Sequence, residues 1–128
     1  MTAWKPPEHN AVSPYLLVVS VRDMLAFLAA SFGAVERYRS EQPDGSIKHA
    51  EVRIDDSIVM MGERPAGSAA TCCSTHVYVP DVDAAYQRAL AAGAASIAEP
   101  RDQPYGDRGA GVRDAEGNLW WIGTHLSR

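Results

Sequence analysis

The sequence has little cysteine and no long apolar run. Its two cysteines, Cys72 and Cys73, are adjacent, and neighbouring residues rarely reach the separation of about 5.5 Å between α-carbons that a disulfide needs. No Cys-x-x-Cys or Cys/His zinc spacing occurs in the chain. Two free thiols in a reducing cytosol are the favoured interpretation, with a redox pair as the alternative, and we predict a cytoplasmic location.

Several other classes of protein are disfavoured by what is missing. No apolar segment approaches the roughly 20 residues of a membrane span, and residues 1–10 carry Lys5 and Glu8 where a signal peptide would have an apolar core. The net charge of −4 opposes binding to nucleic acid or to an anionic membrane. No Ser/His/Asp order and no glycine-rich phosphate loop is present. The 128 residues, 46% of them hydrophobic, predict one globular domain over residues 1–128.

What the chain does contain is an internal repeat with an offset of 60 residues. Asp23 and Gly33 in the first copy correspond to Asp83 and Gly93 in the second. Aspartate is a favoured helix N-cap because its carboxylate accepts the unpaired N–H groups of the first turn. Glycine readily adopts the left-handed conformation that ends many helices. Because apolar residues recur at helical spacing between these positions, the repeat predicts two matching helices.

Strand-like segments surround both predicted helices. One run rich in β-branched and aromatic residues precedes each helix, and three short runs separated by turn residues follow it. The expected strands are 15–19, 35–40, 48–54 and 57–62 in the first half and 75–79, 96–99, 109–113 and 119–125 in the second. Both halves therefore read β-α-β-β-β. The prediction is an α+β fold with module one over about 13–63, a linker over 64–73 and module two over about 74–125.

Two such modules in tandem resemble the vicinal oxygen chelate superfamily of glyoxalases, bleomycin-resistance proteins and dioxygenases. Segments 103–108 (QPYGDR) and 114–125 (DAEGNLWWIGTH) are similar to the PhnB-like branch, which has a Tyr-Gly-x-Arg segment before an Asp-Pro-x-Gly-Asn turn. Ala115 stands where that turn usually has proline. The resemblance spans about 13–125 and implies a curled mixed sheet around a cavity and a homodimer.

The resemblance also implies four metal-ligand positions, one on the first and one on the last strand of each module, which usually carry His, Gln or Glu. In module two the positions are His76 and, three residues after Asn118, Trp121. The 60-residue offset carries His76 to Leu16, and aligning Leu119 with Ser57 places the remaining position at Val59 (or its neighbour Met60). Of these, His76 alone is an ordinary metal ligand. We therefore expect neither a metal nor a cofactor, and the alternative is an unorthodox metal site on His76 with Glu63 or His125.

Strand alternation predicts which side chains face the cavity. If Trp121 faces it, then His125 on the same strand and His76 and Tyr78 on the first strand of module two do so as well. Leu16, Val18 and Met60 are the expected contribution of module one. This lining would be apolar and aromatic with a few polar tips, a composition that suits a flat organic ligand.

Two further residues, Tyr105 and Arg108, lie in the loop before the seventh strand. Arg108 is interpreted either as a clamp for a ligand carboxylate or phosphate or as a salt-bridge partner of Asp102 or Asp107. The alternating polar residues of segment 49–53 are expected to face solvent or a second subunit. The full set of expected ligand-binding residues is Leu16, Val59, Met60, His76, Tyr78, Tyr105, Arg108, Trp121 and His125.

These observations lead to competing functional hypotheses. The first is a metal-free small-molecule-binding protein that sequesters an aromatic or amphipathic compound, such as an antibiotic. The alternative is a glyoxalase-type lyase, isomerase or dioxygenase with an atypical or absent metal site, in which His76 would be the candidate catalytic base. A dimeric interaction module with a collapsed cavity is a third hypothesis. The step from fold to activity is in each case an analogy.

Overall fold

The computed structural model describes residues 3–126 and contains two modules of the predicted type. Module one consists of β1 (Tyr15–Val18), α1 (Val21–Phe32), β2 (Val35–Glu41), β3 (Ile47–Ile54) and β4 (Ser57–Glu63). Module two consists of β5 (Ser74–Tyr78), α2 (Val82–Ala91), β6 (Ala95–Asp102), β7 (Asp107–Arg113) and β8 (Leu119–His125). The predicted α+β class and the tandem β-α-β-β-β order are confirmed.

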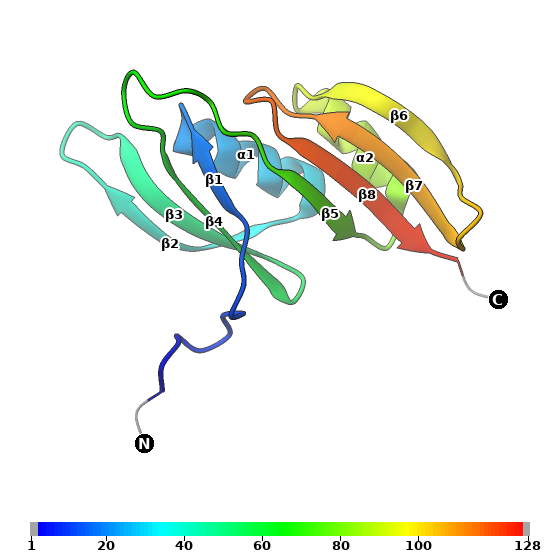
Figure 1. Cartoon of the computed structure of the whole chain (residues 1–128), viewed down its shortest axis with the longest axis horizontal. Coiled ribbons are helices and arrows are strands. Elements are labelled where there is room, and N and C mark those ends of the chain that lie inside the picture. The colour runs from blue at the N-terminus through cyan, green and yellow to red at the C-terminus, as the bar shows by residue number, and fades with distance from the viewer. Residues whose placement is uncertain (1–2, 127–128) are drawn as a thin grey trace.

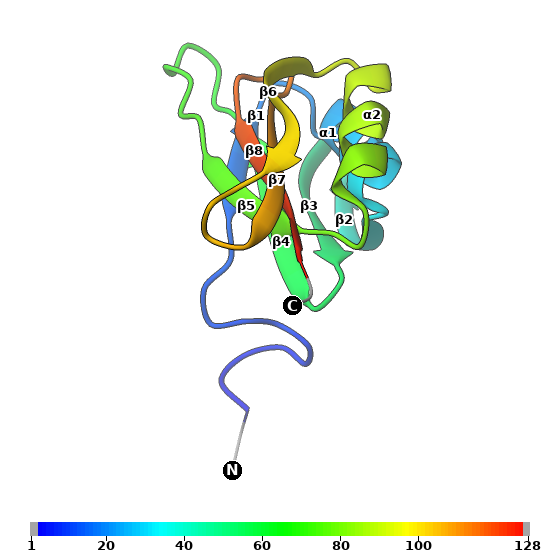
Figure 2. The same cartoon turned by 90° about the vertical axis from the view of Figure 1, so that its right-hand side faces the viewer.

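Each module forms its own four-stranded mixed sheet. The strand orders are β1-β4-β3-β2 and β5-β8-β7-β6, with one parallel pair in each sheet and antiparallel pairs elsewhere. The sheets lie side by side, β2 and β6 are at the outer edges, and both helices cover the same side (Figures 1 and 2). The opposite side, which we call the open face, carries no helix. The sequence predicted one curled sheet around a cavity. The structure has two separate sheets, and they do not close around a cavity within one chain.

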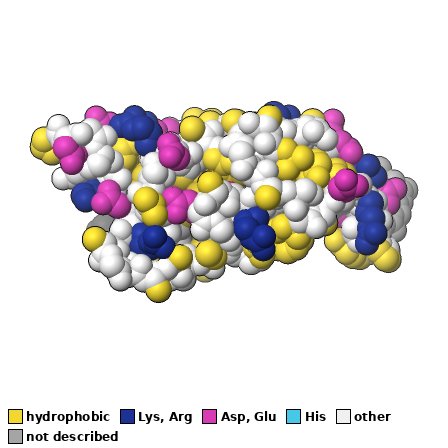
Figure 3. Space-filling view, turned by 90° about the horizontal axis from the view of Figure 1, so that it is seen from above, with side chains coloured by type: hydrophobic (Ala, Val, Ile, Leu, Met, Phe, Trp, Pro, Cys, Tyr) yellow, Lys and Arg dark blue, Asp and Glu magenta, His cyan; other side chains and the backbone are white. Residues whose placement is uncertain are grey.

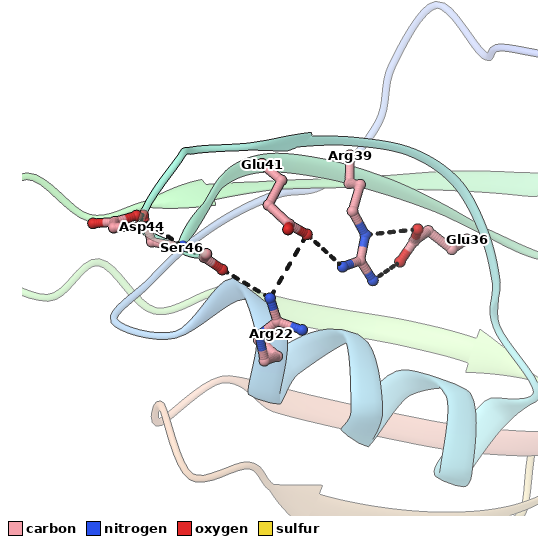
Figure 4. Close-up of polar contacts among 7 residues, drawn as sticks. Arg22, Glu36, Arg39, Glu41, Asp44 and Ser46 are labelled. Carbon is pink, nitrogen blue, oxygen red and sulfur yellow. Dashed lines mark hydrogen bonds and ion pairs between the residues drawn. The ribbon is translucent and has the colours of Figure 1, made fainter.

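The outer edge strands are protected in two different ways. Strand β6 runs three residues beyond the predicted range because an edge strand tolerates Pro100, which cannot donate to a ladder. Strand β2 is lined by ion pairs: Arg39 contacts Glu36 and Glu41, and the Arg22 guanidinium from α1 contacts Glu41 as well (Figure 4). Charged side chains along an edge oppose pairing with another chain. Protection of this edge is therefore enough to explain the charged side chains of β2, and no ligand is needed.

The helix caps differ from the predicted ones at their N-terminal ends. Ser20 and Asp81 are the N-caps, and their side chains accept hydrogen bonds from the backbone N–H groups of Asp23 and Ala84. Asp23 and Asp83 lie inside the first turns, where a carboxylate is also favoured by the helix dipole. The predicted N-caps were therefore wrong. Gly33 ends α1 in the left-handed conformation with φ of 67°, as predicted.

The corrected caps change which strand positions are equivalent. α1 has one residue more than α2 between its N-cap and the glycine that follows the helix. Tyr15 pairs with Met60 as His76 pairs with Trp121, so equivalent strand positions are 61 residues apart, not 60. A one-residue slip along a strand moves a side chain to the other face of the sheet. Leu16 and Val18 are consequently misplaced, and Val59 is misplaced because Leu119 is equivalent to Ile58 and not to Ser57. All three side chains are buried under the helices.

The two modules are joined by a continuous core. The ring centroids of Phe32 at the end of α1 and Trp120 on β8 lie 5.4 Å apart. The Arg88 guanidinium on α2 donates to the carbonyl of Ser31, and Glu116 accepts from the backbone N–H groups that precede α1. These contacts connect segments that are distant in sequence. They fix how the open faces of the two sheets are oriented in one chain.

The surface has no broad field of one charge on the side seen in Figure 3, where basic and acidic groups alternate among hydrophobic and neutral atoms. Within residues 3–126, neither helix has the length and apolar composition needed to cross a bilayer.

Candidate functional site

The open face of module two carries three of the predicted site residues. His76 and Tyr78 extend from β5, and Trp121 extends from β8, where it pairs with His76 in register. Their neighbours Val77 and Trp120 point to the opposite side and belong to the buried core. This arrangement follows the predicted alternation along both strands. The sheet therefore brings an imidazole, a phenol and an indole together on one surface.

Glycines allow these rings to lie along the sheet. A methyl group placed on Gly111 of β7 would lie 2.6 Å from Cζ3 of Trp121, and one on Gly123 of β8 would lie 3.0 Å from Nε2 of His76. Without a Cβ at these positions, each ring rests on backbone and turns its other face to the open side. The indole Nε1 of Trp121 donates to Oγ of Ser74 at 2.9 Å, which fixes the ring orientation. The surface is thus aromatic, and its Trp121 ring is held in one orientation.

One acidic group lies beside these rings. Asp107, at the start of β7, is 5% exposed. Its carboxylate accepts a hydrogen bond from the Tyr78 hydroxyl at 2.7 Å and contacts Nδ1 of His125 at 3.1 Å. The rings of His76 and Tyr78 are 4.6 Å apart at an angle of 64°. Asp107 therefore connects Tyr78 and His125 at one end of the open face, and His76 lies against Tyr78.

The same contacts shift two pKa values. The hydrogen bond from Tyr78 is the largest cause that holds the pKa of Asp107 below its ordinary value of 3.8, followed by the bond with His125. The hydrogen bond to Asp107 raises the pKa of Tyr78 above its ordinary value of 10.0. A neutral phenol next to a carboxylate anion is the resulting state near neutral pH.

We expect Asp107 to contribute stability that disappears in acid. A carboxyl group whose pKa is lower in the folded state stabilises the fold above its unfolded pKa and loses that contribution as the pH falls through its folded pKa. Between about pH 5 and about pH 3, the urea midpoint should therefore fall more for the parent protein than for Asp107→Asn. Equal decreases in the two proteins would show that Asp107 gains nothing from Tyr78 and His125.

Arg108, which was predicted in the loop before β7, is the second residue of that strand and is not a free anion clamp. Arg108 donates Nε and one terminal nitrogen to Asp83, at 2.8 and 3.0 Å, and its other terminal nitrogen to Asp102 at 3.0 Å. The salt-bridge interpretation of Arg108 is thus the one that the contacts support, with Asp83 as an additional partner that the sequence pattern did not indicate. Tyr105 is 72% exposed in this loop. It stands apart from the core of both modules.

The open face of module one contains a hydrogen-bonded chain that the sequence interpretation missed. The Tyr15 hydroxyl is 3.0 Å from Nδ1 of His49, Nε2 of His49 is 3.1 Å from Glu51, and the other oxygen of Glu51 is 2.6 Å from Nε2 of His9. The alternation of segment 49–53 was a usable signal for the shared face, but its polar residues were expected to face solvent or a second subunit and were not recognised as a connected chain. Met60 lies beside Tyr15 on the same face.

Two depressions lie near these surfaces. A cleft of about 320 Å³ opens where the residues before β1, the β3–β4 turn and β5 meet, and His76 and Tyr78 line it together with Pro14, Ser57 and Ile58. A second groove of about 470 Å³ lies between α1 and the β7–β8 turn, with Met24 and Phe27 in its wall. The first depression adjoins the candidate site, whereas the second lies on the helix side of the molecule.

The four ligand positions implied by the resemblance do not form a metal site. With the corrected register they are occupied by Tyr15, Met60, His76 and Trp121. An indole N–H only donates and a thioether is a weak acceptor, so this donor set does not suit a divalent cation that binds through imidazole and carboxylate. Among residues 3–126, no group of three or more His, Cys, Asp or Glu is arranged to hold a metal ion. Glu63 is paired with Lys48 at 3.0 Å, and His125 with Asp107.

Comparison with known proteins gives consistent results. The family model of the Glyoxalase/Bleomycin resistance protein/Dioxygenase superfamily matches residues 9–122. An uncharacterized protein of Mycobacterium bovis is 36% identical over 124 residues, covering 88% of this chain and 82% of that protein. The crystal structure of TioX from Micromonospora sp. ML1 superposes with a TM-score of 0.78 at 30% identity, covering 91% of this chain and 99% of TioX.

A more distant structure supports the fold alone. The fosfomycin resistance protein FosX from Mesorhizobium loti has a TM-score of 0.68 at 17% identity, covering 91% of this chain and 92% of FosX. The tandem modules, the paired first and last strands of each sheet and the family match over residues 9–122 agree with one another. The chain therefore belongs to the glyoxalase/bleomycin resistance protein/dioxygenase superfamily.

Proposed function

We propose that this chain is a metal-free binding protein that sequesters a planar aromatic or amphipathic small molecule, with an antibiotic as one such class. The observation that supports the proposal most is the position of the Trp121 side chain. Its ring rests on Gly111 with its N–H held by Ser74, at a position where metal-dependent members would have a ligand. Stacking on such a ring contributes about 1 kcal/mol in addition to burial at roughly 25 cal/mol per Å².

The neighbouring groups fit the same role. His76 and Tyr78 add ring surface next to Trp121, and Asp107 with His125 adds a polar end. Ligand sites are typically apolar with a few fixed polar groups that set orientation. We assign the aromatic body of the ligand to Trp121 and its polar end to the side of Asp107.

A second subunit is part of the proposal. The open face leaves large apolar side chains of module one exposed, among them Tyr15, Leu17 and Tyr38, and the sheets do not close on themselves. A homodimer that places one open face against another would cover these side chains and complete a cavity around the ligand. The free thiols Cys72 and Cys73 support a cytoplasmic location, and the Asp114–Asn118 turn before β8 supports the PhnB-like branch.

The test is binding of planar compounds by Trp121→Ala. A panel of aromatic antibiotics and dyes is titrated into the protein and followed by calorimetry and by tryptophan fluorescence. We expect at least one compound to bind and to quench the fluorescence, and Trp121→Ala to weaken its binding at least about tenfold. Trp4→Ala, a change at an exposed indole outside both modules, should bind like the parent protein. Absence of binding across the panel, or unchanged binding by Trp121→Ala, would contradict the proposal.

A second candidate function is favoured by the Tyr15–His49–Glu51 chain. A phenol that donates to an imidazole held by a carboxylate is suited to acid–base chemistry, as in a metal-free isomerase or lyase. This candidate predicts turnover of a bound compound, lost in His49→Ala and retained in Trp121→Ala. Elemental analysis separates both candidates from a metal enzyme: stoichiometric nickel, zinc or iron that is lost in His76→Ala would overturn the metal-free proposals.

A further inference from the structure

The segment before β1 crosses the open face of module one and places a carboxylate between two arginines. Nη2 of Arg37 donates to one oxygen of Glu8 and Nη1 of Arg53 donates to the other, each at 2.5 Å. Glu8 itself has a φ of 65°, in the left-handed region that glutamate seldom adopts. The backbone is therefore turned in an unfavourable way at the residue whose side chain reaches both arginines.

The two arginines are held in place by the sheet. They come from the neighbouring strands β2 and β3, close to the bulge that interrupts the pairing of these strands between Glu36 and Tyr38. The Arg53 guanidinium also donates Nε to the carbonyl of Asp55 at 2.7 Å, which fixes its plane. Among the described residues, Glu8 is the only carboxylate that Arg37 contacts. Two neighbouring guanidinium groups that serve both oxygens of one carboxylate form a typical carboxylate receptor.

Aromatic side chains lie next to this pair of arginines. Tyr38 follows Arg37 directly and pairs in register with Glu51, two residues from Arg53. The ring of Tyr38 is 6.0 Å from that of His49, which is 5.7 Å from the ring of Tyr15. A molecule with its acid group on the arginines would therefore share a face of the sheet with these rings. Glu51, on the same strand as Arg53, is hydrogen-bonded to His9 and His49.

We infer that Arg37 and Arg53 form a binding site for an aromatic carboxylate, and that Glu8 occupies this site as an internal substitute when no ligand is bound. The inference is independent of the proposed function, because it concerns the other module and a charge-specific contact in place of a stacking surface. Among the described residues, few side chains hold the segment that carries Glu8 to the sheet. Apart from Glu8, the side chains that anchor the segment are His9, on Glu51, and Asn10, which accepts from the N–H of Ile58 at 3.3 Å.

The probe pair for this inference is benzoate and benzamide, which share a ring and differ in charge. Binding is measured by calorimetry and by chemical shifts of the Tyr38 and Arg53 amides. Removing the internal carboxylate in Glu8→Ala should strengthen benzoate binding at least about tenfold over the parent protein, and benzamide should bind neither protein measurably. Adding Arg37→Gln and Arg53→Gln to Glu8→Ala should abolish benzoate binding. His9 is retained in all variants so that the hydrogen bond between His9 and Glu51 is unchanged.

A matched control is available on the same strand. Glu36→Ala removes an exposed carboxylate that is paired with Arg39, and it should leave benzoate binding at the level of the parent protein. Because the ion pairs involved are exposed, all variants should keep the parent thermal midpoint within about 3 °C. Equal benzoate binding by Glu8→Ala and the parent protein, equal binding of benzamide, or benzoate binding that survives loss of both arginines would overturn the inference. Trp121→Ala should not change these results, so the proposed function can fail separately.

Discussion

Replacing Trp120 with alanine is expected to lower the free energy of unfolding by about 3–5 kcal/mol. The indole is 1% exposed, packs on Phe32 across the junction of the modules, and donates Nε1 to the Asp114 carboxylate at 2.9 Å. Its removal leaves a cavity between the modules and takes a donor from a buried anion. Urea denaturation followed by far-ultraviolet circular dichroism measures the loss.

The adjacent tryptophan is the control for this experiment. Trp121 has the same side chain one position further along β8, but it lies on the open face. Trp121→Ala should therefore cost less than about 1.5 kcal/mol, because no core cavity forms. Similar losses from both substitutions would mean that Trp120 does not connect the two modules. The comparison tests the face assignment directly, since the two residues differ in little else.

Replacing Asp114 with alanine is expected to cost about 3 kcal/mol, although the side chain is short and polar. One carboxylate oxygen accepts from the backbone N–H groups of Glu116 and Asn118, both at 2.9 Å. The other accepts from Trp120 and from the Asn118 amide at 3.2 Å. Without the carboxylate, buried donors of Trp120 and Asn118 lose their partner, and an unsatisfied buried donor costs about 1–3 kcal/mol.

An exposed turn carboxylate serves as the reference for Asp114. Asp44, in the β2–β3 turn, accepts from the N–H and hydroxyl of Ser46, and Asp44→Ala should cost much less than Asp114→Ala because water replaces the exposed carboxylate. The double variant of Asp114 and Trp120 should lose less than the sum of the single losses, since both changes remove one shared hydrogen bond. If the losses of the two single variants add up to that of the double variant, the hydrogen bond between Asp114 and Trp120 contributes nothing to stability.

The fold was predictable because the repeat appears at several levels of the sequence. Helix-ending glycines, strand alternation and turn residues recur in the same order, and each has a local physical cause. Alternation along β8 also placed Trp120 and Trp121 on opposite faces correctly. Local rules of this kind need only neighbouring residues, which explains their success.

The site was predicted less completely, for two identifiable reasons. The offset of 60 was measured between glycines at the helix ends, and one additional residue in α1 shifted Leu16 to the wrong face. Val59 was misplaced separately, because aligning Leu119 with Ser57 is one residue out of register. The difference in helix length could not be detected from the sequence, because Asp23 and Asp83 inside the first turns were taken for the N-caps. The second reason is distance in sequence: His9 meets Glu51 across 42 residues, and Arg108 meets Asp83 across 25. No local pattern records these contacts.

The two open faces have the same backbone plan but different chemistry, and this difference constrains any symmetric dimer. Module one presents a phenol–imidazole–carboxylate chain and two arginines, whereas module two presents rings seated on glycine. A two-fold axis that sets module one against module two creates two identical mixed cavities. An axis that sets like modules against each other creates one polar and one aromatic cavity instead. The number of equivalent ligands per dimer therefore reports where the symmetry axis lies.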